Sequence, residues 1–131
     1  MRAPAKSTVE RRRPARILVL EDEPVLAFAV EDLLIEAGFE IAGVVGRLPA
    51  ALAMIESGAC DAAIVDANLA GVSASPAASA LTARGLPFIV LSGYSPEQQP
   101  GDFSAANFIQ KPCRGDQLIR VLRSILPADK G

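Results

Sequence analysis

The sequence predicts a doubly wound α/β fold on a parallel sheet, and two observations support this. Apolar runs of strand length alternate with segments of helical periodicity, which is typical of successive βαβ units. The runs are continuously apolar, as expected for parallel strands that are buried on both faces. Four of them lead directly into polar residues, at Glu21, Asp66, Ser92 and Lys111. Because ligands bind outside the carboxyl ends of such strands, we expect these side chains to meet at one rim of the sheet.

The first half of the chain alternates strand and helix twice. Pro24 is a favoured first-turn residue, and apolar residues recur at helical spacing from there to Gly38, a suitable C-terminal cap. Glu40 and Gly43 interrupt the next apolar run, which is typical of an edge strand. The expected elements are a strand over 16–21, a helix from Pro24 that is capped by Gly38, an edge strand over 39–45 and a helix over 49–57 that Gly58 stops.

The second half continues the alternation with one interruption. Ser75 before Pro76 predicts an N-cap followed by a first-turn proline. Pro96, Pro100 and Gly101 leave room for about one helical turn over 96–99, so the fourth helix is expected to be shortened. The expected elements are a strand over 61–66, a helix from Ser75 that stops at Gly85, a strand over 87–92, an irregular segment over 93–106, a strand over 107–110 and a helix over 115–126 that Pro127 stops.

Composition narrows the classes of function. The chain has 131 residues, which suits one domain, and it contains no histidine. Histidine triads, histidine metal sites and histidine phosphocarriers are therefore excluded, and a donor histidine would have to lie on a partner. Cys60 and Cys113 match no metal or redox spacing, so we interpret them as packing thiols in a reduced protein. With no secretory signal and no membrane-spanning run, a cytoplasmic location is expected.

Charge is distributed unevenly along the chain. Residues 1–16 carry six basic side chains and one acidic side chain, whereas the remainder carries seven basic and fourteen acidic ones. We expect residues 1–14 to be a disordered basic leader and residues 128–131 to be a short tail. Nucleic-acid binding through the leader is the alternative interpretation. The acidic remainder argues against nucleic-acid binding by the domain itself.

The polar strand ends predict a phosphoryl-transfer chemistry. Glu21, Asp22 and Asp66 would place three carboxylates in one small cleft, where they repel each other and need a cation. Mg²⁺ meets that need, because it prefers an open carboxylate site with water and phosphate oxygens. Asp66 could act as the nucleophile and become an acyl phosphate. Lys111 would supply positive charge to the transferred group, and the Ser92 hydroxyl would hydrogen-bond one of its oxygens.

At this point the chain resembles the receiver domains of bacterial two-component response regulators, over about residues 15–127. The motifs that carry the resemblance are Ile17-Leu18-Val19-Leu20-Glu21-Asp22-Glu23-Pro24, Asp66, Leu91-Ser92-Gly93 and Lys111-Pro112. The resemblance implies a flavodoxin-like five-stranded parallel sheet in the order 2-1-3-4-5, with helices on both faces.

The resemblance also implies roles for individual residues. Asp66 matches the phospho-acceptor, Asp22 the direct metal ligand and Glu21 its water-mediated neighbour. Asn68 matches the residue whose backbone carbonyl binds the metal. Lys111 matches the phosphate-binding lysine. Ser92 matches the switch hydroxyl of the family, and Phe108 matches its switch aromatic residue. Tyr94, which follows the Ser92-Gly93 motif, is the third expected switch residue. For Phe108 and Tyr94, plain packing is the alternative interpretation.

Some positions depart from the family pattern. Leu69-Ala70 stands where Met-Pro is usual, and Cys113 stands where an aromatic residue usually follows Lys111-Pro112. Gly93-Tyr94 is similar to a subgroup of stand-alone receivers that work with an atypical class of sensor histidine kinases, although that subgroup usually has threonine where this chain has Ser92.

The expected function is therefore that of a single-domain response regulator in a phosphorelay, and not of a conventional turnover enzyme. It would accept a phosphoryl group from a sensor histidine kinase or a phosphotransfer protein onto Asp66 with Mg²⁺. It would then signal to a downstream protein by a change of shape, or act as a phosphate sink. Two alternatives stay open. One is an adaptor module that works without phosphorylation. The other is an Mg²⁺-dependent phosphatase, a class that would want an acid where this chain has Asn68.

Overall fold

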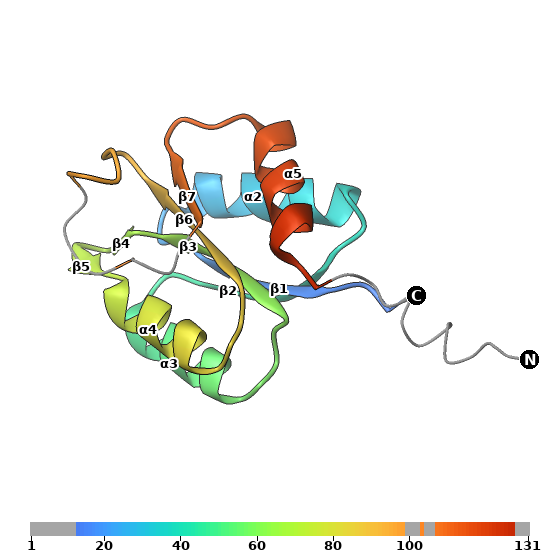
Figure 1. Cartoon of the computed structure of the whole chain (residues 1–131), viewed down its shortest axis with the longest axis horizontal. Coiled ribbons are helices and arrows are strands. Elements are labelled where there is room, and N and C mark those ends of the chain that lie inside the picture. The colour runs from blue at the N-terminus through green and yellow to red at the C-terminus, as the bar shows by residue number, and fades with distance from the viewer. Residues whose placement is uncertain (1–12, 99–102, 104–106, 128–131) are drawn as a thin grey trace, which may run out of the picture.

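The computed structural model describes residues 13–98, 103 and 107–127. Five parallel strands form one sheet in the order β2-β1-β3-β6-β7, which confirms the predicted order (Figure 1). The strands are β1 (Arg16–Leu20), β2 (Glu40–Val45), β3 (Ala62–Asp66), β6 (Phe88–Ser92) and β7 (Asn107–Gln110). β2 lies at an edge, as its polar and glycine residues predict.

Helices cover both faces of the sheet. They are α2 (Pro24–Glu36), α3 (Leu48–Glu56), α4 (Ser75–Ala83) and α5 (Gly115–Ile125). α2 and α5 pack on one face, and α3 and α4 pack on the other (Figure 1). The boundaries of these helices differ from the predicted ones by no more than two residues, and the largest difference is at the end of α4, which was predicted at Gly85 and lies at Ala83.

The core consists of two apolar layers, one on each side of the sheet. Strand residues alternate between them, so that Ile17 and Val19 face α2 and α5 while Leu18 and Leu20 face α3 and α4. All of β3 and β6 is buried, which explains why these runs are continuously apolar. Burying each large aliphatic side chain contributes about 1.5–3 kcal/mol. The central strands are therefore rigid supports for the residues at their carboxyl ends.

A short antiparallel hairpin after β3 was not predicted. It pairs β4 (Asn68–Leu69) with β5 (Val72–Ser73) through the two residues Ala70 and Gly71. Both turn residues have positive φ, 52° at Ala70 and 84° at Gly71, as a tight hairpin turn of this length requires. Strands of two residues are too short to produce a readable period in the sequence, and alanine at the first turn position gives little warning of a positive φ.

The predicted N-cap of α4 is wrong, because the chain enters this helix from the hairpin. Ser75 is the first helical residue and not the N-cap; Ala74 holds that position without a side-chain hydrogen bond. The Ser73 hydroxyl instead accepts a hydrogen bond from the Ser75 N–H at 3.2 Å. The chain approaches the helix from β5, where Ala74 N–H bonds the Ala67 carbonyl at 2.9 Å, and this pairing fixes the entry to the helix.

Between β6 and β7, the described residues 93–98 and 103 contain no helix. Gln98 N–H donates to the Ser95 carbonyl at 3.0 Å and closes one turn, in keeping with the shortened fourth helix. The rest of the segment predicted to be irregular, 99–102 and 104–106, lies outside the described residues, as do most of the predicted leader (1–12) and the tail (128–131). No helix in the described part of the chain is both long and apolar enough to cross a bilayer.

Candidate functional site

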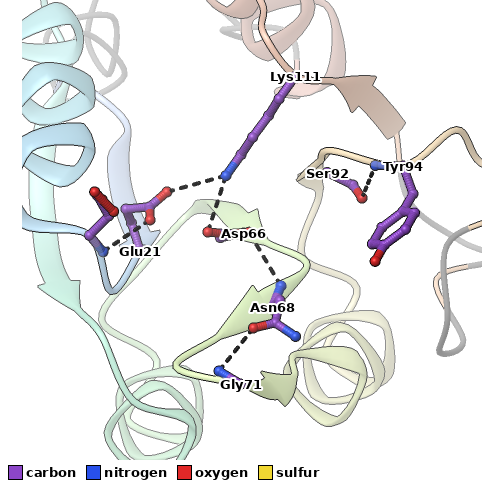
Figure 2. Close-up of polar contacts among 8 residues, drawn as sticks. Glu21, Asp66, Asn68, Gly71, Ser92, Tyr94 and Lys111 are labelled. Atoms are coloured by element: carbon purple, nitrogen blue, oxygen red, sulfur yellow. Dashed lines mark hydrogen bonds and ion pairs between the residues drawn. The ribbon is translucent and has the colours of Figure 1, made fainter.

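The carboxyl edge of the sheet gathers predicted site residues from four segments that are far apart in the sequence (Figure 2). Glu21 follows β1, Asp66 ends β3, Ser92 ends β6 and Lys111 follows β7. Because these four strands are neighbours in a parallel sheet, their ends lie at the same edge. The structure thus brings Glu21, Asp66 and Lys111 into contact at one rim.

Lys111 connects the two buried acids. Its Nζ lies 3.2 Å from Asp66 Oδ2 and 3.9 Å from Glu21 Oε1 (Figure 2). Its backbone N–H donates to the Ser92 carbonyl at 2.6 Å, which ties the loop after β7 to the end of β6. The Lys111 residue is therefore fixed at both ends, by its ammonium at the end of β3 and by its backbone at the end of β6. A charge at this position can stabilise a doubly negative group on Asp66.

Three carboxylates come together beside this lysine. Oxygen atoms of Glu21, Asp22 and Asp66 all lie within 4.8 Å of one another. Glu21 and Asp66 are buried, and Asp22 is exposed. The cluster is therefore open to solvent on the side of Asp22. Hard oxygen donors that are crowded together and open to water on one side fit a small divalent cation such as Mg²⁺.

The pKa of Glu21 reflects its burial and the crowding of the carboxylates. The pKa of the Glu21 carboxyl is raised from 4.5 to about 7, chiefly by burial and also by the neighbouring Asp66 carboxylate, whereas the hydrogen bond from Glu23 N–H and the positive charge of Lys111 lower it. That hydrogen bond, from Glu23 N–H to Glu21 Oε2 at 3.1 Å, fixes the side chain in the loop after β1. The single ammonium of Lys111 therefore leaves the acid cluster incompletely neutralised.

The hairpin holds Asp66 from the other side. Asn68 N–H donates to Asp66 Oδ1 at 3.2 Å, and the Asn68 side-chain Oδ1 accepts the Gly71 N–H at 2.9 Å (Figure 2). The side chain of Asn68 thus supports the turn, while its backbone contacts the acid. The sequence did not predict these contacts, although Asn68 itself was predicted to belong to the site.

The three predicted switch residues lie in different environments. Ser92 is buried, and its hydroxyl accepts a hydrogen bond from Tyr94 N–H at 3.0 Å. The Tyr94 ring is 56% exposed and lies away from the acid cluster in Figure 2, so both its packing and its switch interpretations stay predictions. Phe108 is half-buried against the apolar layer beneath α3 and α4, as the packing interpretation expects.

Gly46 was not among the predicted site residues, yet it lies against the loop that carries Glu21 and Asp22. A Cβ atom at this position would be 3.1 Å from Asp22 Cα and 3.4 Å from the Glu21 carbonyl oxygen. The loop is close because Glu21 N–H donates to the Val45 carbonyl at 2.9 Å. A glycine directly after the edge strand was the only sequence signal for this close approach.

The two cysteines are unpaired, in agreement with their interpretation as packing thiols. Burial raises the pKa of the Cys60 thiol and of the Cys113 thiol, which keeps both protonated and poorly nucleophilic. Cys60 is buried in the layer beneath α3 and α4. Cys113 is partly exposed in the loop between β7 and α5.

Comparison with known proteins identifies the family. The model of the response regulator receiver domain matches residues 17–123, and the chain belongs to this family. It is 33% identical over 114 residues to the sensory transduction protein RegX3 of Mycolicibacterium smegmatis, and the match covers 84% of this chain and 50% of that protein. The chain therefore spans about half the length of the curated relatives it matches.

Solved structures agree with this assignment. The chain is similar to SdrG from Sphingomonas melonis Fr1, with a TM-score of 0.73, 36% identity, and coverage of 86% of this chain and 97% of that one. The chain is also similar to the receiver domain of a modulated diguanylate cyclase from Desulfovibrio desulfuricans G20, with a TM-score of 0.77 and 23% identity. This match covers 89% of this chain and 97% of that one, and at this identity it shows the shared fold alone. A receiver domain takes part in two-component signalling and is not a conventional enzyme.

Proposed function

We propose that this chain is a single-domain response regulator that accepts a phosphoryl group on Asp66 in the presence of Mg²⁺. The observation that carries the proposal is the position of Asp66, which contacts the ammonium of Lys111 at 3.2 Å and lies within 4.8 Å of carboxylate oxygens of Glu21 and Asp22. The single-domain reading is supported by SdrG, because the match covers 97% of that solved chain. A solved SdrG from Pseudomonas melonis Fr1, 38% identical to this chain, is described as a beryllofluoride-activated conformation.

The residues that would hold Mg²⁺ are Glu21, Asp22 and Asp66, together with the backbone carbonyl of Asn68. The donor set fits because it consists of oxygen atoms that are already grouped and partly open to water. When bound, the ion supplies charge neutralisation to the acids and to the oxygens of the transferred group. Glu21, the most buried of the three acids, would contribute through a bound water.

The transfer step is an in-line displacement. A carboxylate oxygen of Asp66 forms a bond to phosphorus as the bond between phosphorus and the donor's imidazole nitrogen breaks, and the electron pair leaves with the imidazole. Lys111 is close enough to Asp66 to follow the added charge, and Ser92 would contribute its hydroxyl. Because Lys111 N–H bonds the Ser92 carbonyl, movement of one residue would move the other's loop. Tyr94 and Phe108 would transmit this movement as switch residues.

The partners that follow from this proposal are proteins. A sensor histidine kinase or a phosphotransfer protein would donate the group, since the chain has no histidine of its own. A downstream protein would bind the phosphorylated form, or the chain would drain phosphate from a shared kinase. The net charge of -7 after residue 16 argues against nucleic acid as a partner of the domain, and we propose that the protein acts in the cytoplasm.

Phosphotransfer from a kinase tests the proposal. Purified histidine kinases from the same genome are autophosphorylated with radiolabelled ATP and mixed with the wild type, with Asp66→Asn and with Asp61→Asn. Asp61 is a matched control because it precedes the amino end of β3, the same strand that Asp66 ends. We expect at least one kinase to label the wild type and Asp61→Asn but not Asp66→Asn. Labelling of Asp66→Asn would refute the assignment of the acceptor.

The adaptor alternative predicts a different pattern. If the chain is an adaptor that works without phosphorylation, the wild type and Asp66→Asn should bind the partner with equal affinity. Pull-down of partners with both forms, in the presence and absence of acetyl phosphate, distinguishes the two functions. We expect partner binding to change with acetyl phosphate in the wild type only.

A further inference from the structure

A cavity of about 500 Å³ opens between α2 and α5, directly beside the acid cluster. Apolar side chains of both helices and of the end of β6 line most of it, and Glu21 and Lys111 lie among its lining residues. This volume and this mostly apolar lining with a few polar groups are typical of small-molecule sites. The phosphoryl-acceptor chemistry proposed above does not use the apolar part of the cavity.

The cavity exists because its walls include small residues. Ala29 of α2, Cys113 and Gly115 contribute little volume beside the larger Leu33 and Leu118. A Cβ atom at Gly115 would lie only 3.0 Å from a methyl carbon of Leu33, so the start of α5 approaches α2 closely at that point. A ring at position 113, where this chain has a thiol, would occupy space that is open here.

The charge at the polar end of the cavity selects the kind of occupant. The Lys111 ammonium contacts Glu21 and Asp66, and Asp22 has a carboxylate oxygen within 4.8 Å of theirs. Three acidic side chains are therefore grouped around one ammonium, which leaves an excess of acidic groups. The nearby Arg114 does not correct this, because its exposed guanidinium is paired with Asp116 at 3.0 Å. A ligand with a positive head group would therefore be attracted, whereas a carboxylate would be repelled.

We propose that this cavity binds a small amphiphilic amine, with its aliphatic part between α2 and α5 and its ammonium beside Glu21. The same carboxylates would then serve the ammonium and a divalent cation, so the amine binds the metal-free protein and competes with Mg²⁺. Occupancy of the cavity regulates phosphoryl acceptance by withholding the metal. The binding step is independent of the proposed phosphorylation; the competition step rests on the proposed Mg²⁺ site.

Methyl NMR of the full chain tests the binding step. Hexylamine, hexanol and hexanoate are titrated into metal-free protein, and the leucine methyl signals of Leu26, Leu33 and Leu118 are followed. We expect saturable shifts with the affinity order amine, alcohol, carboxylate. Cys113→Phe and, independently, Ala29→Leu should abolish the shifts. Ser79→Phe, which adds the same ring at an exposed position of α4 on the opposite face, should retain them.

The competition step has its own measurement. Saturating Mg²⁺ should weaken hexylamine binding by about fivefold or more, the lower end of coupling between linked sites. Equal affinity for the three head groups, or shifts that survive in both filled variants, would overturn the amine site. Amine binding that Mg²⁺ leaves unchanged would overturn the regulatory part of the proposal. None of these outcomes depends on whether Asp66 accepts phosphate.

Discussion

Lys111 carries the positive charge that faces the two buried acids, Glu21 and Asp66, at 3.9 and 3.2 Å. It therefore has two opposite effects on the proposed chemistry. In the ground state it repels a metal ion that binds the same carboxylates, whereas in the transition state it stabilises the transferred group. A substitution that removes the charge and keeps the length of the side chain separates these effects.

We therefore expect Lys111→Met to bind Mg²⁺ several-fold more tightly than the wild type. It should accept a phosphoryl group about a hundredfold more slowly, the usual cost of removing one stabilising donor. Calorimetric titration with Mg²⁺ and the rate of labelling by acetyl phosphate measure the two effects. Arg120→Met, which removes an exposed cation from α5, should change neither. Weaker Mg²⁺ binding by Lys111→Met would contradict the competing role of the ammonium.

Glu21 makes the stability of the metal-free protein depend on pH. Its pKa is raised from 4.5 to about 7 in the folded protein, chiefly by burial. Between these values the folded state binds the proton more strongly than the unfolded state does, so its stability falls as pH rises through this range. The loss is on the order of 3 kcal/mol, because one pKa unit corresponds to about 1.4 kcal/mol.

Urea unfolding in EDTA between pH 4.5 and pH 8 measures this loss. Glu21→Gln should remove most of the decline and should be more stable than the wild type at the upper end of the range. Glu36→Gln, at the exposed end of α2, serves as the control and should behave as the wild type does. Parallel curves for the wild type and Glu21→Gln would show that Glu21 is charged in the folded protein throughout.

Among the elements, the β4–β5 hairpin combines backbone strain with contact to Asp66, the proposed acceptor. Ala70 has a φ of 52°, a conformation that costs a residue with a Cβ atom about 1 kcal/mol or more. Asn68 joins the same turn to Asp66 through its backbone N–H. The strain is thus located two peptide bonds from Asn68, the residue whose backbone N–H contacts Asp66.

Ala70→Gly should relieve this strain and stabilise the protein by about 0.5–1 kcal/mol, less the entropy that glycine adds to the unfolded state. Urea unfolding at constant pH gives the change. Ala53→Gly, on the exposed side of α3, is the matched control and should destabilise by about 0.5–1 kcal/mol. Destabilisation of similar size in both variants would mean that Ala70 is not strained.

The sheet could be predicted because its central strands are long and uniformly buried, as in Ile17–Leu20 and Phe88–Leu91. The meeting of Glu21, Asp66 and Lys111 followed from the rule that parallel strands end at one edge. Contacts made by short or non-periodic segments could not be predicted in this way. The Asn68–Gly71 bond, the cap of α4 and the exposure of Tyr94 depend on tertiary positions that no local pattern encodes.

At the scale of the whole molecule, charge separates the two ends of the chain. Residues 1–16 have a net charge of +5, and the remainder has a net charge of -7. The basic residues enter the fold at Arg16, at the amino end of β1, whereas the acid cluster lies at the carboxyl edge. At physiological salt, charges of exposed groups are screened over about 8 Å. The basic segment is therefore not expected to influence the acceptor chemistry.

Removing residues 1–12 should leave the rate of acetyl phosphate labelling within about twofold of the full chain, because screening separates the basic segment from the site. Neither form should bind duplex DNA at physiological salt. Fluorescence anisotropy with a labelled duplex over a range of salt concentrations checks this point. Binding by the full chain that persists at physiological salt and is lost on truncation would instead support nucleic-acid binding through the leader.

Intact-mass spectrometry after incubation with Mg²⁺ and acetyl phosphate tests the central claim most directly. Wild type, Asp66→Asn and wild type with EDTA are compared under identical conditions. Our account predicts one added phosphoryl group in the wild type, none in Asp66→Asn and none when EDTA removes the metal. An adduct that persists in Asp66→Asn or in EDTA, or a wild type that no phosphoryl donor modifies, would contradict it.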